Sequence, residues 1–164
     1  MTETLRARAY LSPGHGQNVW DLVVLPHDER RVRRRAIELV HGDTVLVDFP
    51  EPVTLESGGA LALENGLNVE IIAGEERLYE VRGKDHIHLM QLCWHLGNRH
   101  LKVQIEREWE GIGERILILR DHVIRDMLIG LGATVTEISE PFHPQEGAYT
   151  HAHGSEDHAL LNKK

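Results

Sequence analysis

A helix that ends at a glycine and passes at once into a strand constrains this chain more than any other stretch. Apolar residues recur at helical spacing over residues 85–96, at Ile87, Leu89, Met90, Cys93, Trp94 and Leu96. Gly97 follows directly, and a glycine just past such a run can take the left-handed backbone that ends a helix. His100 should therefore lie on a fixed turn between two packed elements, where a neutral ring nitrogen is available to a borderline metal ion.

The order of elements around this helix predicts a fold. We expect strands at residues 78–82, 103–109, 116–119 and 134–138, and helices at 85–96 and 121–131. Asp85 and Asp121 are placed to cap the two helices. This β-α-β-β-α-β order predicts a ferredoxin-like domain, with both helices on one face of a four-stranded sheet.

Residues 1–74 read instead as short strands separated by turns. Asn65-Gly66 is the strongest hairpin-turn signal in the chain. The spacing of strands and turns suits a small antiparallel sandwich or barrel. Because the composition changes near Gly74, we predict an α+β protein with two domains, an antiparallel β domain at 1–74 and the ferredoxin-like domain at 75–140.

A run of arginines interrupts the β domain. Its members are Arg30, Arg31, Arg33, Arg34 and Arg35. Charged runs usually face water, so a solvated strand or turn face is the favoured interpretation, and a patch for an anionic partner is the alternative. His27 and His41 lie beside loop residues and have no partner at motif spacing.

The last stretch, residues 141–164, lacks periodicity. Prolines and glycines break it, and its polar end is not supported by a core, so we expect a mobile tail. The tail carries His151, His153 and His158. His151 and His153 are two residues apart, which a flexible chain can close around one ion, and an idle tail is the equally open alternative.

Composition excludes several classes of protein. The single cysteine, Cys93, cannot form an intramolecular disulfide, which favours the cytoplasm. No apolar run approaches the roughly 18 residues of a membrane span, and no signal-peptide h-region is expected at the N-terminus. The net charge of −8 argues against a nucleic-acid partner.

Histidine is the unusual component, with 12 residues in the chain, nine of them in its second half. His88 and His95 share a polar helix face but lie about 10 Å apart along the axis, so a solvated face is favoured for both. His122 stands beside a helix cap that explains Asp121 but not the imidazole. Because ligands are sparse within one chain, we expect sharing between chains, where a two-fold axis would pair His100 with its own copy.

Two other classes of function compete with metal binding. A hydrolytic metal enzyme would use His100, His122 and a carboxylate such as Asp121, but no second carboxylate or base stands at motif spacing, so we predict a non-enzyme. The second alternative is a non-enzymatic interaction module, in which the β domain binds a peptide and the histidines are incidental.

The motifs of the second half resemble one family. They are His95-Leu-Gly-Asn-Arg-His100 with Val103-Gln-Ile105, Arg120-Asp-His-Val-Ile124 with Met127-Leu128, Leu131-Gly-Ala133, Pro141-Phe142 and Gly147-Ala-Tyr149 before a histidine-bearing tail. Together they resemble the UreE family of urease accessory nickel metallochaperones over residues 75–153. The first half looks like the N-terminal β domain of that family on weaker grounds.

The resemblance implies a function for these residues. The family forms homodimers through the ferredoxin-like domains, binds nickel at the dimer interface and delivers it to the urease apoprotein with an accessory GTPase. By position, His100 matches the interface nickel ligand, and His122 matches one histidine of a second pair. His151, His153 and His158 match the variable metal-binding tail. Imidazole also binds Cu²⁺ and Zn²⁺, so these ions are expected to compete with Ni²⁺ in vitro.

Two departures from the family limit what can be transferred. Arg120 stands where some relatives carry the other histidine of the second pair, which puts an internal two-histidine site in doubt. The tail has only three histidines after Tyr149, which argues for few additional ions per chain.

Overall fold

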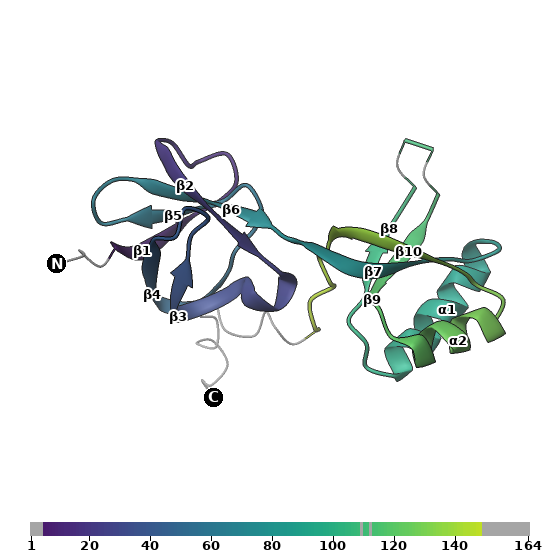
Figure 1. Cartoon of the computed structure of the whole chain (residues 1–164). Coiled ribbons are helices and arrows are strands. Elements are labelled where there is room, and N and C mark those ends of the chain that lie inside the picture. The colour runs from purple at the N-terminus through teal and green to yellow at the C-terminus, as the bar shows by residue number, and fades with distance from the viewer. Residues whose placement is uncertain (1–4, 109, 112, 149–164) are drawn as a thin grey trace, which may run out of the picture.

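The computed structural model describes residues 5–108, 110–111 and 113–148 of the 164-residue chain. It contains two sheets, one in each half, and β7 (Glu75–Arg82) leads from the first half into the second (Figure 1). The segment after the last strand, β10 (Thr134–Pro141), runs back from the second domain toward the first. In the part of the chain that is described, no helix is long and apolar enough to cross a membrane.

The first domain is a six-stranded sheet with the order β2-β6-β5-β1-β4-β3. Its strands are β1 (Leu5–Leu11), β2 (Val19–Leu25), β3 (Arg31–Glu38), β4 (Thr44–Thr54), β5 (Ala60–Leu63) and β6 (Asn68–Ala73), with the 3-10 turn η1 (His27–Glu29) after β2. The edge strands approach each other where the Val40 N–H donates to the Leu22 carbonyl at 3.0 Å. The inward-facing apolar side chains, including Val45, Val47 and Ile71, are fully buried.

This sheet is mixed, which refines the predicted antiparallel arrangement. The β1–β4 and β2–β6 pairs are parallel, and the remaining pairs are antiparallel. Parallel strands need a long connection, and the intervening strands supply one in both cases. Short-range signals such as the Asn65-Gly66 turn, where Gly66 has a φ of 85°, report only hairpins.

The second domain confirms the predicted ferredoxin-like fold. Its elements are β7 (Glu75–Arg82), α1 (His86–Asn98), β8 (Gln104–Glu106), β9 (Arg115–Leu119), α2 (His122–Gly130) and β10 (Thr134–Pro141). The strand order is β10-β7-β9-β8, and all three pairs are antiparallel. Both predicted caps are present, since the Asp85 carboxylate accepts from the His88 N–H at 2.8 Å and Asp121 accepts from the Ile124 N–H at 3.0 Å.

The two helices cover one face of this sheet and form the core of the domain. The buried residues of α1 are Leu89, Leu92 and Leu96, and those of α2 are Ile124 and Leu128. They pack against sheet residues such as Val81 and Ile116. Cys93 is half-buried beside them and remains a free thiol.

Only some of the apolar residues of α1 lie in the core, whereas the prediction placed all of them there. Ile87, Met90 and Trp94 were expected in the core stripe, but they are 63%, 57% and 65% exposed. Helix α1 is apolar on more than one side, and a single sheet face can cover only the side that carries Leu89 and Leu96. The other side is left as an exposed apolar row.

The tail was predicted to begin at residue 141, but the first two residues of this stretch are part of the packed second domain. Pro141 is the last residue of β10, and Phe142 is fully buried with Leu78 and Leu117 on the sheet face opposite the helices. The burial of an aromatic side chain therefore fixes the chain beyond residue 141, which prolines alone did not indicate. Residues 149–164 lie outside the described part.

Candidate metal-binding site

His100 occupies a left-handed turn at the end of α1. Its φ is 55°, and α1 continues through Gly97, which does not have a positive φ. The His100 N–H donates to the Gly97 carbonyl at 3.0 Å, and the Leu101 N–H donates to the Leu96 carbonyl at 3.4 Å. These two bonds form a Schellman motif in which His100 takes the place that glycine usually occupies.

The prediction that Gly97 takes the left-handed backbone is therefore wrong, because His100 takes it. The positive φ costs a non-glycine residue about 1–3 kcal/mol, and histidine is among the residues that adopt it more often. The imidazole is exposed. The turn therefore presents an exposed imidazole on a left-handed backbone.

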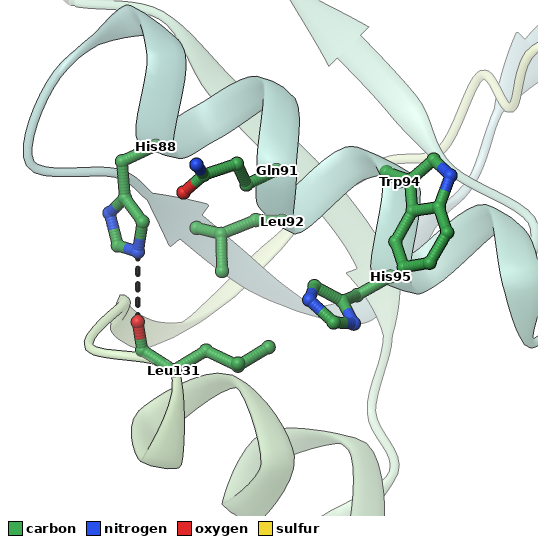
Figure 2. A pocket seen from close by; sticks show the side chains of 6 residues that line it. All are labelled: His88, Gln91, Leu92, Trp94, His95 and Leu131. Carbon is green, nitrogen blue, oxygen red and sulfur yellow. Dashed lines mark hydrogen bonds between the residues drawn. The ribbon is translucent and has the colours of Figure 1, made fainter.

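His88 is half-buried, and its ring is hydrogen-bonded within the domain instead of being free on a solvated face. Figure 2 shows its ring pointing from α1 toward the Leu131 carbonyl, to which Nε2 donates at 2.8 Å. The Lys84 N–H donates to its Nδ1 at 2.9 Å, so both ring nitrogens are engaged. His88 is a structural imidazole and is not free to bind a metal.

His95 lines a shallow pocket between α1 and the end of α2. The pocket has a volume of about 290 Å³ and is lined by His88, Gln91, Leu92, Trp94, His95 and Leu131. The ring of His95 meets the ring of Trp94 edge to face, with 5.1 Å between their centroids. Through Trp94 the pocket borders the exposed apolar row of α1.

His122 is the exposed first residue of α2. The preceding Arg120 is occupied elsewhere, because it donates to the Leu78 carbonyl at 3.2 Å, to the Ile138 carbonyl at 3.1 Å and to Glu137 at 3.1 Å. In this chain the position before Asp121 therefore joins two strands and gives His122 no imidazole partner.

The described residues hold no group of three or more His, Cys, Asp or Glu side chains that could bind a metal ion. His100 and His122 are both described, whereas His151, His153 and His158 lie among residues 149–164, outside the described part. His86, at the start of α1, pairs with Glu114 at 2.7 Å, and this carboxylate raises the pKa of the imidazole.

Between the domains lies a polar cleft that the sequence did not predict. Its volume is about 790 Å³, and its lining includes His27, Arg30, Arg31, Lys102, His143 and Gln145. The Nδ1–H of His27 donates to Glu76 at 2.7 Å, and Nε2 lies 3.3 Å from the Lys102 ammonium. His27 is separated from both partners by long stretches of chain, so no sequence spacing could have revealed the contact.

Two members of the arginine run, Arg30 and Arg31, line this cleft, and only Arg30 is buried. Arg30 is only 6% exposed and donates to the Phe142 carbonyl and to Nδ1 of His143. Arg31, Arg33, Arg34 and Arg35 are exposed, as the interpretation as a solvated face predicted. The sequence could not distinguish the buried Arg30 from its exposed neighbours, because the partners of Arg30 lie more than one hundred residues away.

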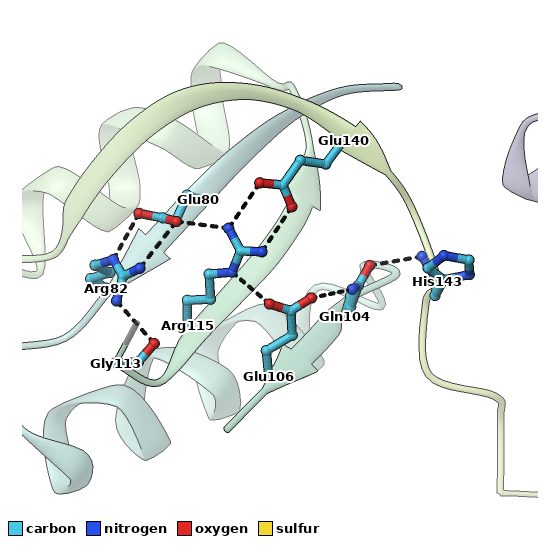
Figure 3. A network of polar contacts seen from close by, with 8 residues as sticks. All are labelled: Glu80, Arg82, Gln104, Glu106, Gly113, Arg115, Glu140 and His143. Atoms are coloured by element: carbon cyan, nitrogen blue, oxygen red, sulfur yellow. Dashed lines mark hydrogen bonds and ion pairs between the residues drawn. The ribbon is translucent and has the colours of Figure 1, made fainter. Parts of the chain in front are cut away.

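The cleft continues into a polar network on the open face of the second sheet (Figure 3). The His143 N–H donates to the Gln104 side chain at 2.7 Å, and Gln104 in turn bonds Glu106. Arg115 joins Glu106 at 2.6 Å, Glu80 at 2.9 Å and Glu140 at 2.8 Å, and these hydrogen bonds, first of all that to Glu140, raise the pKa of its guanidinium. The network ties β7, β8, β9 and β10 to the segment after residue 141.

Two family models match the chain, the N-terminal domain of the UreE urease accessory protein over residues 1–74 and its C-terminal domain over residues 76–163. The chain belongs to the UreE family. This membership confirms the resemblance seen in the sequence and gives the protein a role in urease maturation, as an accessory protein.

Curated members of the UreE family are similar over most of the chain. The urease accessory protein UreE of Rhizobium rhizogenes is 52% identical over 93% of this chain and 88% of its own length. That of Agrobacterium fabrum is 48% identical over 94% of this chain and 92% of its own. That of Mesorhizobium japonicum is 58% identical over 79% of this chain, but the match spans 63% of the relative's length.

Proposed function

We propose that this UreE family member is a nickel metallochaperone, which holds Ni²⁺ between two copies of the chain and delivers it to the urease apoprotein. The observation that carries the proposal is His100, an exposed imidazole on a left-handed turn. One such ring supplies one ligand. A homodimer with His100 on its two-fold axis supplies two.

The apolar row on α1 supports a dimer in which the two ferredoxin-like domains meet. Ile87, Met90 and Trp94 are all more than half exposed and lie on the helix that ends at the His100 turn. Adjoining exposed apolar residues are uncommon on a monomer surface and are typical of protein interfaces. An interface over this row would bring the two copies of the turn close together.

Tail histidines would complete the coordination of the ion. His151 and His153 are suited to the open positions, with His158 and His122 as further ligands. Imidazole suits Ni²⁺ but also Cu²⁺ and Zn²⁺, so selection of nickel would come from its supply and from the receiving complex, the urease apoprotein with its accessory GTPase. Because metal binds the neutral ring and protons compete for it, nickel binding should weaken as the pH falls.

Calorimetric titration of nickel into the parent, His100→Ala and His86→Ala tests this assignment. His86 is the matched control, because it is also an exposed histidine but lies at the start of α1, at the end of the helix away from the His100 turn. We expect His100→Ala to weaken the tightest nickel site at least tenfold and His86→Ala to leave it unchanged. Equal nickel affinity in His100→Ala and the parent would overturn the carrier.

A parent protein that retains almost no nickel in equilibrium dialysis would also overturn the proposal and favour the interaction module. Light scattering on the same samples, with and without nickel, reports whether the metal-bound species is a dimer.

A further inference from the structure

We propose that Leu101 and Lys102 are positioning residues for His100, which fasten its turn to the core on one side and to the N-terminal domain on the other. The inference rests on the proposed role of His100 as a nickel ligand. It adds a part for the N-terminal domain, because His27 of that domain contacts Lys102, two residues after His100.

Leu101 holds the turn from inside the second domain. Its side chain is half-buried and packs against the core that contains Leu92 and Leu96. Its N–H donates to the Leu96 carbonyl, which is the longer-range bond of the Schellman motif. A contact between this position and the last helical turn commonly accompanies the motif, because it keeps the chain folded back over the helix end.

Lys102 connects the same turn to His27 of the first domain. Its ammonium can only donate, so Nε2 of His27 accepts at 3.3 Å. Nδ1 of His27 then carries the hydrogen and donates it in the hydrogen bond to Glu76. The His27 N–H donates to the second oxygen of Glu76 at 2.9 Å. The side chains of His27 and Glu76 are only 7% and 13% exposed, so Lys102 contacts a fixed acceptor and not a mobile surface group.

A third contact holds the chain just beyond these two residues. The carbonyl of Val103 accepts a hydrogen bond of 2.7 Å from the Gln145 N–H. Gln145 lies after β10, on the segment that leads toward the tail. The three residues that follow His100 are thus attached to separate parts of the molecule, while the imidazole of His100 is left exposed.

These attachments matter because the left-handed backbone is unfavourable for histidine. In a loosened turn, the backbone of His100 would exchange between the left-handed conformation and extended conformations, and the extended ones would point the ring in another direction. The apparent dissociation constant of a ligand rises in inverse proportion to the binding-competent fraction of the protein. If the competent fraction falls to about one third, nickel affinity falls about threefold although no ligand has been removed.

Nickel calorimetry on full-length Leu101→Ala and Lys102→Met tests the proposal. Leu89→Ala is the matched control, because Leu89 is buried in the same core at the opposite end of α1. We expect about threefold to tenfold weaker binding in Leu101→Ala, a smaller loss in Lys102→Met, and unchanged affinity in Leu89→Ala despite its lower stability. Leu101→Met should restore most of the affinity.

A double-mutant cycle tests the path through the first domain. Glu76→Gln and Lys102→Met should each weaken nickel binding, and the double variant should be no weaker than Lys102→Met alone, since both changes interrupt one chain of contacts. In the metal-free proteins, the backbone chemical shifts of His100 should move in Leu101→Ala and Lys102→Met but stay in place in Leu89→Ala.

The shifts separate this inference from the proposed function. If His100→Ala binds nickel like the parent, the carrier fails, while the metal-free shifts still report whether Leu101 and Lys102 hold the turn. Unchanged His100 shifts and nickel affinity in both Leu101→Ala and Lys102→Met would overturn the positioning role. An equal loss of affinity in Leu89→Ala and Leu101→Ala would also overturn it, because general loosening of the core would then explain the effect.

Discussion

Nη1 of Arg30, in the N-terminal domain, lies 2.9 Å from Nδ1 of His143, which follows the last strand of the ferredoxin-like domain. A guanidinium can only donate, so Nδ1 accepts and the neutral imidazole carries its proton on Nε2. The same guanidinium donates to the Phe142 carbonyl. One buried cation of the first domain therefore holds the chain as it leaves the second.

Replacing Arg30 with methionine should destabilise the protein by about 2–4 kcal/mol, because hydrogen bonds from a charged donor are lost and the Phe142 carbonyl is left without this partner. Urea unfolding, followed by circular dichroism, measures the loss. Arg33→Met is the control, since Arg33 belongs to the same run but is exposed, and it should change stability by less than about 0.5 kcal/mol. Equal effects of the two substitutions would contradict the structural role of Arg30.

The contact with Arg30 also predicts a pH dependence. Partial burial and the charge of Arg30 lower the pKa of His143. The neutral ring is favoured in the folded protein, so its contribution to stability is present above the unfolded pKa of about 6.5 and is lost as the pH falls through the lower folded value. The free energy of unfolding should therefore decrease from pH 7.5 to pH 5.

The variant His143→Gln isolates this contribution. Its amide oxygen can still accept from Arg30 but does not titrate. Its unfolding free energy should fall less steeply with decreasing pH than that of the parent. His86, whose pKa is raised by Glu114, acts in the opposite direction, because its contribution is lost as the pH rises. A steeper fall in His143→Gln would show that the sign is wrong.

The sequence predicted most of the fold because its signals are local. Caps such as Asp85 and Asp121, and the Asn65-Gly66 turn, depend on neighbouring residues and lie where expected. The parallel pairs of the first sheet depend on strands far apart in the chain. No turn or periodicity reports such pairs, so the predicted sheet was antiparallel throughout.

The candidate site shows the same division. His100 was singled out from its place after a helix, yet its left-handed backbone was assigned to Gly97, because propensity favours glycine where the protein uses histidine. The division of α1 into a buried and an exposed apolar side depends on which side meets the sheet. Periodicity alone therefore placed Trp94 in the core, whereas the packed domain leaves it exposed.

The exposed row of α1 gives a prediction for the proposed dimer. Trp94→Glu places a carboxylate in the apolar interface, where an unpaired charge is strongly unfavourable, so light scattering should show a monomer at micromolar concentration. The amount of nickel bound per chain at the tightest site should also fall in Trp94→Glu, because the dimer that holds the ion is lost. Val40→Glu is the control, because Val40 is 55% exposed on the first domain and should leave the dimer intact. A dimeric Trp94→Glu would place the interface elsewhere.

Arg120 provides a last prediction, because its side chain joins two strands of the second sheet. Its planar guanidinium reaches two main-chain carbonyls, of Leu78 on β7 and Ile138 on β10, as well as Glu137. Lysine keeps the charge, but its single nitrogen cannot reproduce this fork. Arg120→Lys should therefore lower the unfolding free energy by about 1–3 kcal/mol in urea titrations.

Arg125→Lys is the matched control for Arg120→Lys, because Arg125 is exposed on α2, and it should be close to neutral. Nickel titration of Arg120→Lys should give the affinity of the parent, since Arg120 holds β7 and β10 and contributes no ligand. If Arg120→Lys were as stable as the parent, the charge alone would account for Arg120. The hydrogen bonds to the two strands would then contribute little.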